Sequence, residues 1–168
     1  AWIAGDDELG RPYAFRRDLQ ALSERYLLAV PSNTLIRDLD AAEPLYRQVQ
    51  EITHELGDYE TMAIALLNLA MVAIARGDAA DGRELLGETL RILDRIGSLP
   101  IGQSLIEVSA GLAALQEEWA QSARYFGIAE ADAQRTGIHR DPADEAFLAP
   151  RIQAARETLG SDCFVAAE

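Results

Sequence analysis

The sequence contains no lysine, and its fifteen basic residues are all arginine. The absence of lysine excludes three kinds of site from the 168 residues: the phosphate-binding lysine of a Walker A loop, a Schiff-base lysine for pyridoxal phosphate and the strand lysine of protein kinases. The chain also lacks a Ser-His-Asp arrangement, a glycine-rich phosphate loop and histidines or cysteines at metal-ligand spacing. We therefore expect no catalytic residue, no cofactor and no metal ion, and a protein that is not an enzyme.

Cysteine, basic charge and long apolar runs are also scarce. The single cysteine, Cys163, cannot form an internal disulfide, so nothing indicates an oxidising compartment. A formal net charge of -13 argues against direct binding to nucleic acid or to an anionic membrane surface. The longest apolar stretch, Met62 to Ala75, is interrupted by Asn68 and is shorter than the roughly 18 residues of a membrane-spanning helix. The N-terminus lacks the features of a signal peptide, and we expect a soluble, cytoplasmic protein.

What the chain does contain favours helices. About a sixth of its residues are alanine, glycine and proline fall mostly between periodic stretches, and runs of β-branched residues are absent. A length of 168 residues with 49% hydrophobic residues suits one domain with a substantial core. The composition therefore predicts a single domain of the all-α class.

Glycines recur along the chain with a fixed period. Gly57, Gly97 and Gly137 lie 40 positions apart, and each follows a run typical of the last turns of a helix. Glycine at such a place indicates a left-handed helix C-cap, because a residue without Cβ adopts that conformation at little cost. The same offset superposes Ala70 on Ala110, which predicts close helix contacts at both positions. The period divides a single helical-repeat domain, 1–168, into a degenerate repeat (12–57), two repeats (58–97 and 98–137) and a capping segment (138–168).

Both ends of this repeat array carry their own signals. Near the N-terminus, one helical stripe is formed by apolar residues at turn spacing: Phe15, Leu19, Leu22 and Tyr26. At the other end, Asp141-Pro142 indicates the start of a C-terminal helix, and Pro150 predicts a kink or a restart within it. We expect Phe164 and Val165 to fold back over the last helix pair, because an open stack would otherwise expose its packing face.

The second repeat resembles tetratricopeptide repeats. The residues that carry the resemblance are Leu66, Asn68-Leu69-Ala70, Ala73, Gly77-Asp78, Leu86 and Gly97. The family's usual unit is shorter, and a 40-residue unit also allows HEAT or armadillo repeats; the glycine-aspartate turn favours the tetratricopeptide reading. The resemblance implies a right-handed α-α superhelix of antiparallel helix pairs, ended by a C-terminal capping helix.

The C-terminal half is similar to the repeat region of large bacterial regulators. The similarity is carried by the segment 116–131 and by Gly137, Pro142, Arg156, Leu159-Gly160 and Phe164. The families concerned are LuxR-type and antibiotic-regulator-type proteins and cyclase-linked signal-transduction ATPases, in which an NTPase module precedes a long repeat array. The resemblance implies that this chain is a C-terminal fragment with a sensor role in signal transduction or transcription regulation.

The candidate site is an apolar row on the first helix of the second repeat, with one polar member. Its residues are Ile64, Leu67, Asn68, Met71 and Ile74. In a tetratricopeptide superhelix such a row lines the concave surface, where it would form a binding groove. The alternative is that neighbouring helices bury the row as core. For Asn68 we expect a structural hydrogen bond between helices, because the equivalent positions in the neighbouring repeats are Val108 and Leu28.

Three functions are compatible with such a row. The leading hypothesis is a non-catalytic domain that binds a protein or peptide partner, including missing modules of the same chain, and so regulates a larger protein. The first alternative is a small-molecule sensor in which Ile64, Leu67, Met71 and Tyr26 line a closed apolar cavity. The second is an oligomerisation module in which the row forms a homo-oligomer interface.

Overall fold

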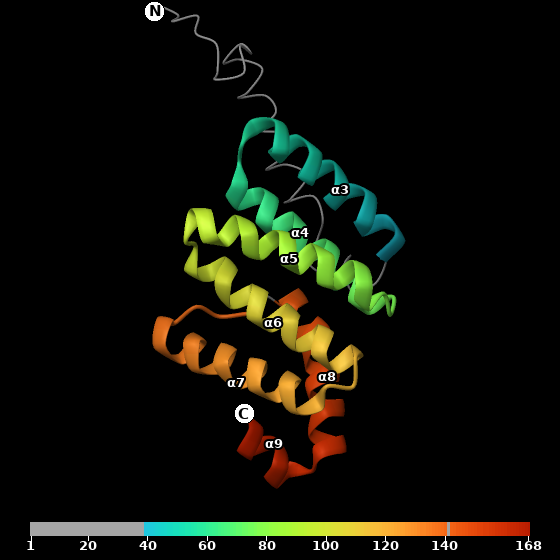
Figure 1. Ribbon diagram of the computed structural model, residues 1–168, viewed down its shortest axis with the longest axis vertical. Helices are drawn as coiled ribbons and strands as arrows, with labels where there is room; N and C mark the ends of the chain where they lie inside the picture. Colours follow the sequence, from blue (N-terminus) through green and yellow to red (C-terminus); the bar gives the residue numbers. More distant parts are fainter. Residues whose placement is uncertain (1–38, 141) are drawn as a thin grey trace, which may run out of the picture.

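The computed structural model describes residues 39–140 and 142–168, and over these ranges it contains seven helices and no strand (Figure 1). The prediction of the all-α class is confirmed for this part of the chain. The apolar stripe at Phe15 to Tyr26 lies outside the described residues. The helices are α3 (Leu39–Leu56), α4 (Tyr59–Ala75), α5 (Ala79–Ile96), α6 (Leu99–Leu115), α7 (Trp119–Thr136), α8 (Pro142–Leu159) and α9 (Ser161–Ala167).

Helices α3 to α7 run antiparallel to their neighbours and follow one another along the long axis of the molecule, whereas α8 crosses α6 and α7 (Figure 1). The closest pairs are α4 with α5 and α6 with α7, which are the two helices of each predicted repeat. Each first helix also contacts the first helix of the next unit, because α4 packs against α6 and α6 packs against α8. The helices thus form two layers, and α4 and α6 lie side by side in one of them.

The turns between units are set by glycine. The backbone φ angles of Gly57, Gly97 and Gly137 are +67°, +67° and +73°, so the predicted left-handed conformation is confirmed at all three. At the ends of α5 and α7 the glycine N–H donates back into the helix, from Gly97 to Leu93 O at 2.8 Å and from Gly137 to Ala133 O at 2.9 Å. These bonds satisfy carbonyl groups that would otherwise lack a partner at a helix end.

The turn inside each repeat differs between the two units. In the second repeat Gly77 has φ +85°, and the Asp78 carboxylate caps α5 by accepting hydrogen bonds from the N–H groups of Ala80 and Asp81. In the third repeat the glycine position is held by Glu117, which has φ +60° and is the one non-glycine residue with positive φ in the described ranges. Glu118 makes no side-chain cap for α7.

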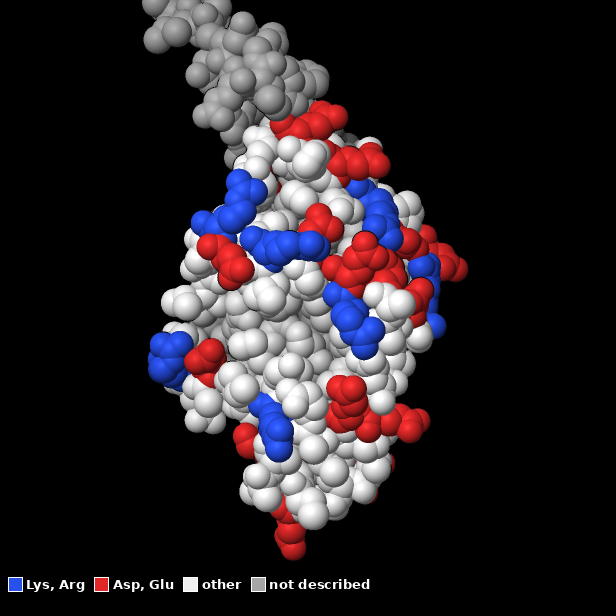
Figure 2. Space-filling view, in the orientation of Figure 1, with Lys and Arg blue, Asp and Glu red and all other residues white. Residues whose placement is uncertain are grey.

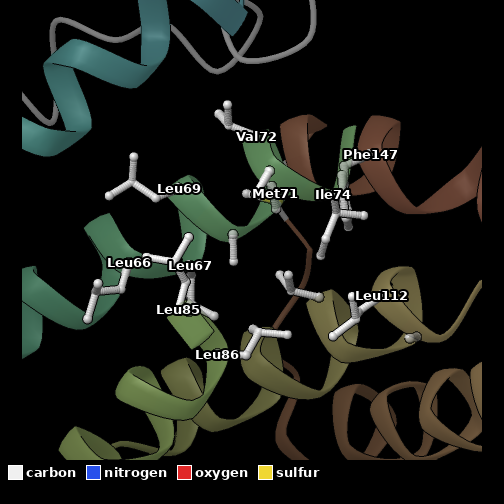
Figure 3. Close-up of a cluster of buried hydrophobic side chains, with 14 of the residues drawn as sticks. Leu66, Leu67, Leu69, Met71, Val72, Ile74, Leu85, Leu86, Leu112 and Phe147 are labelled. Atoms are coloured by element: carbon white, nitrogen blue, oxygen red, sulfur yellow. The ribbon is translucent and has the colours of Figure 1, made fainter. Parts of the chain in front are cut away.

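The core is centred on α4, which is apolar on nearly all sides because other helices surround it. In Figure 3, Leu69 and Val72 extend toward α3. Small residues allow the helices to approach, since Ala70 and Ala110 are both 0% exposed. Their burial agrees with the prediction of close helix contacts at these two alanines.

Glycine allows a close approach between α6 and α8. A methyl group on the Cα of Gly111 would lie 2.6 Å from two ring atoms of Phe147, which is closer than side-chain carbons come to their neighbours. The Phe147 ring is itself 6% exposed, and the Arg151 guanidinium lies 4.1 Å from the ring centroid. Burial lowers the pKa of Arg151, whose side chain also donates to the Phe147 carbonyl. The absence of a side chain at Gly111 therefore allows α8 to pack on α6.

Two expectations about the C-terminal segment, a kink or a restart at Pro150 and the folding back of Phe164 with Val165, are corrected in one part each. No restart occurs at Pro150, because α8 is one helix from Pro142 to Leu159. Proline removes the hydrogen bond to the carbonyl of Ala146, but both residues are exposed, so water can reach that carbonyl. Phe164 is fully buried as expected, whereas Val165 is 69% exposed, since successive residues of a short helix point in different directions.

Candidate functional site

A hollow of about 240 Å³ lies between α4 and α6. Its lining residues are Ile64, Leu67, Asn68 and Met71 of α4, Pro100, Ile101, Ser104 and Val108 of α6, and Asp144 of α8. Four of the five residues of the predicted row thus line one depression. The fifth, Ile74, does not: it is 1% exposed and its side chain packs at Gly82.

The walls of the hollow are fixed by the core beneath them. Leu67 and Met71 are 5% and 2% exposed, so most of each side chain is packed inside the domain and only part borders the hollow. On the opposite wall, Ile101 and Val108 are 4% and 3% exposed. Side chains held in this way cannot rearrange freely, and the shape of the hollow is therefore largely preformed. The predicted row is therefore part of the core and also lines the hollow. Within the row, Ile64 and Asn68 are half-buried, and they expose more surface than Leu67 and Met71 do.

Asn68 is bonded within its own helix. Its Nδ2 donates to the Ile64 carbonyl oxygen, one turn earlier, at 2.9 Å. The expectation of a hydrogen bond between helices is therefore wrong, because the nearest acceptor for the amide belongs to α4 itself. The Oδ1 atom accepts no hydrogen bond from the described part of the chain. Asn68 thus presents an acceptor at the hollow.

The polar groups around the hollow are acceptors and acids. Ser104 and Asn68 contribute neutral oxygens from facing helices, and Asp144 contributes a carboxylate from the first turn of α8. Glu60 lies one turn before Ile64 on α4, and its carboxylate accepts from the Ser98 hydroxyl, just before α6, at 3.5 Å. Among the described residues that line the hollow, none is an arginine. The depression is therefore apolar at its base and negative at its edge.

The position of α8, and with it Asp144, depends on an ion cluster that the sequence did not reveal. The guanidinium of Arg140 lies 3.0 Å from Glu107 on α6, 2.5 Å from Glu130 on α7 and 2.7 Å from Glu145 on α8. Its side chain is 13% exposed and that of Glu107 only 4%. One cation therefore joins three helices at the linker that leads into α8. A glutamate in the middle of the mostly apolar α6 was the available signal in the sequence.

The cluster keeps its arginine charged. Burial by itself would lower the pKa of Arg140, but hydrogen bonds to Glu145 and Glu130 and the charge of Glu107 outweigh it, so the pKa lies above its ordinary value. Gln103 adds to the cluster, since its Nε2 donates to Glu107 at 3.3 Å and to the Ile138 carbonyl oxygen at 3.4 Å. The linker between α7 and α8 is thus bonded to α6 through both side-chain and main-chain groups.

A second groove lies on a different face of α6. It has a volume of about 440 Å³ and is lined by residues of α5, α6 and α7, among them Leu86, Leu90, Leu105, Ser109 and Tyr125. Figure 2 shows an uncharged hollow between α5 and α6 in the middle of the face in view, with charged side chains around it. Leu90 is 52% exposed at this groove.

Metal sites, membrane-spanning helices and similarity to known proteins complete the description of the candidate site. Over residues 39–140 and 142–168, no three histidine, cysteine or acidic side chains are grouped so that they could hold a metal ion. In the same ranges, no helix has both the length and the apolar character needed to cross a membrane. No protein-family model, no curated protein and no solved structure matches the chain. The tetratricopeptide resemblance therefore stays a prediction from the sequence.

Proposed function

We propose that this chain is a tetratricopeptide-like, non-catalytic domain that binds a protein or peptide and regulates a larger bacterial signalling or transcription protein in the cytoplasm. Antiparallel helix pairs at a 40-residue period, with left-handed glycines at their ends, support this proposal. The contacts of α4 with α6 and of α6 with α8 are those that a superhelix of stacked pairs requires. The resemblance of segment 116–131 to regulator tails supports the regulatory role.

The observation that carries the proposal is the hollow between α4 and α6. These are the first helices of two successive repeats, and in the resembled family the first helices line the concave surface. The hollow has a rigid apolar base made by Leu67, Met71, Ile101 and Val108, with an acceptor, Asn68, on one wall. Buried apolar anchors in preformed pockets supply most of the free energy of binding at peptide and protein interfaces.

The volume of the hollow favours a peptide over a small molecule. Pockets for drug-sized ligands usually measure about 300–1,000 Å³ and enclose most of the ligand. The hollow measures about 240 Å³ and is open on one side. It can accept one large side chain of a longer molecule that continues along the surface of α4 and α6. Tyr26, which the small-molecule alternative includes in the cavity, lies outside the described residues.

Binding at this place would act on α8. Asp144 lines the hollow, and the same helix is joined to α6 and α7 through Arg140. A ligand that contacts α4, α6 and Asp144 together stabilises the present position of α8 relative to the other helices. Because a ligand shifts a conformational equilibrium only through its unequal affinity for the two states, this contact is the means by which binding would be transmitted.

Two serines on α6 allow a direct test. Ser104 lines the hollow, whereas Ser109, five residues later, lines the groove of α5, α6 and α7. We expect Ser104→Trp to fill the hollow and Ser109→Trp to fill only the other groove. Peptides selected from a random library on the 168-residue chain should lose at least about tenfold in affinity, about 1.4 kcal/mol, with Ser104→Trp and change little with Ser109→Trp.

The proposal would be contradicted if Ser104→Trp did not weaken peptide binding. Peptides that bind both tryptophan variants as well as the wild type would place recognition outside the hollow. Met71→Glu is a poor variant for this purpose, because Met71 is 2% exposed and a buried carboxylate would unfold the domain. Circular dichroism of both tryptophan variants verifies that the helices are retained.

Self-association is a second candidate function, supported by the groove of α5, α6 and α7, whose lining is mostly apolar and carries Arg83 and Glu118. Leu90 at this groove and Ile128, one turn after Tyr125 on α7, are 52% and 49% exposed. A self-complementary face of this kind suits a two-fold dimer. Sedimentation velocity at several concentrations should show a dimer that Leu90→Glu dissociates. A monomer at every concentration would exclude this function.

A further inference from the structure

The groove of α5, α6 and α7 carries a positive charge on one wall and a negative charge on the other. Arg83 of α5 and Glu118, just before α7, both line the groove, and both are exposed. Neither side chain makes a hydrogen bond or an ion pair with a described residue. Most other arginines of the described ranges do contact a carboxylate or an aromatic ring. Two opposite, uncompensated charges beside an apolar floor make this surface complementary to a second copy of itself.

The two walls of the groove are parallel and equivalent helices. Both α5 and α7 run antiparallel to α6, and each contains 18 residues (Figure 1). Their first residues, Ala79 and Trp119, lie 40 positions apart. A two-fold axis along the groove, parallel to these helices, therefore places α5 of one copy over α7 of the other at the same height. The same rotation creates this contact twice in a dimer.

In this arrangement the exposed groups of the two helices meet in pairs. Arg83 is the fifth residue of α5 and Glu118 immediately precedes α7, so their heights differ by about 7.5 Å, which these two long side chains span together. Leu90 and Ile128, which are 52% and 49% exposed, differ in height by only about 3 Å. Gly87 lies at nearly the height of Ile128, and a Cβ there would meet no atom within 4 Å. The glycine thus leaves a notch on α5 that an isoleucine of the other copy can enter.

We propose that this chain forms a two-fold dimer through the groove of α5, α6 and α7, in which Arg83 of each copy pairs with Glu118 of the other. Ile128 of each copy lies against Gly87 and Leu90 of the other. The inference rests on the self-association proposed above as the second candidate function, and it specifies the groups that determine it. The hollow between α4 and α6 belongs to the other helix layer, so both copies can still bind a peptide.

Charge reversal at the pair tests this arrangement. Arg83→Glu brings two acids together at both contacts of the dimer, and Glu118→Arg brings two arginines together. Each variant alone should therefore self-associate at least about tenfold more weakly than the wild type, measured by sedimentation velocity between about 1 μM and about 1 mM. An equimolar mixture of the two variants should regain the wild-type association to within about threefold, because the mixed dimer again joins opposite charges at both contacts.

A matched control separates the pair from a general effect of charge. Glu51→Arg makes the same change of charge as Glu118→Arg at an exposed position of α3 that does not line the groove, and it should leave the association unchanged. Circular dichroism of all three variants verifies that the helices are retained.

The outcomes separate this inference from the functions proposed above. If the dimer survives both single reversals, or if the mixture associates no better than either variant alone, the pairing of Arg83 with Glu118 is wrong. Self-association through the groove would then stand if Leu90→Glu still dissociates the dimer. A wild-type chain that stays monomeric up to about 1 mM would overturn both self-association and this dimer, while peptide binding at the hollow would be unaffected.

Discussion

Placing a methyl group at Gly111 tests the packing of α8 on α6. Gly111→Ala would put the new Cβ 2.6 Å from Cε1 and Cζ of Phe147, so the ring or the helix must move. The ring is buried and has Arg151 stacked against it, which leaves it little room. Overpacking of this kind costs about 1–3 kcal/mol, and the better helix propensity of alanine returns about 1 kcal/mol. We expect a net loss of up to about 2 kcal/mol in the free energy of unfolding.

A matched glycine provides the control. Gly87 lies in the interior of α5, and a Cβ there would meet no atom within 4 Å, so Gly87→Ala should stabilise the protein by about 0.5–1 kcal/mol. Urea unfolding followed by circular dichroism measures both variants, and thermal unfolding should shift in opposite directions for the two. If Gly111→Ala stabilises the protein as much as Gly87→Ala does, then α8 does not pack on α6 at this glycine, and the placement of Asp144 at the hollow is also wrong.

Three further variants test the charges and turns. Arg140→Met should destabilise the protein by about 3–5 kcal/mol, because it leaves the carboxylate of Glu107 buried without its cation; adding Glu107→Gln should recover much of this loss in urea unfolding. Glu117→Gly should stabilise the protein by about 0.5–1 kcal/mol, since it relieves a left-handed non-glycine residue, and an unchanged unfolding midpoint would contradict this. A hydrogen bond from Arg76 holds the pKa of Glu43 below its ordinary value, so Glu43 contributes stability above its unfolded-state pKa that is lost as the pH falls through its folded-state pKa. Glu43→Gln should therefore be less stable than the wild type at neutral pH and equal to it in acid, as comparison of unfolding curves will show.

Turn geometry was the part of the fold most accessible from the sequence. Gly57, Gly97 and Gly137 adopt positive φ because this conformation is a local property of glycine at a helix end, so their period located the ends of three helices. Proline was a less reliable guide: Pro150 sits within α8, since the carbonyl that it deprives of a partner is exposed. The cost of a proline thus depends on the surroundings of another residue, which the sequence does not show.

The candidate site was predictable only in part. The helical spacing of Ile64, Leu67 and Met71 places them on one face of α4, and the structure brings them to one hollow. The opposite wall belongs to α6 and the charged edge to α8, and these depend on how separate helices pack. Asp144 could not be assigned to the site from its neighbours in the sequence, because the orientation of α8 is determined through Arg140 by residues far away in the chain.

The three carboxylates around Arg140 differ widely in exposure, at 4% for Glu107, 37% for Glu130 and 55% for Glu145. Because of this difference in exposure, the three glutamates should differ in how well the protein tolerates their substitution during evolution. If Glu145 is substituted, two acids remain beside Arg140, and water can solvate the guanidinium on the exposed side. If Glu107 is substituted, the buried side of the guanidinium loses its anion, and water cannot take that place. Descendants of this sequence should therefore retain the arginine before α8 together with the acid in the middle of α6, while the two outer glutamates drift.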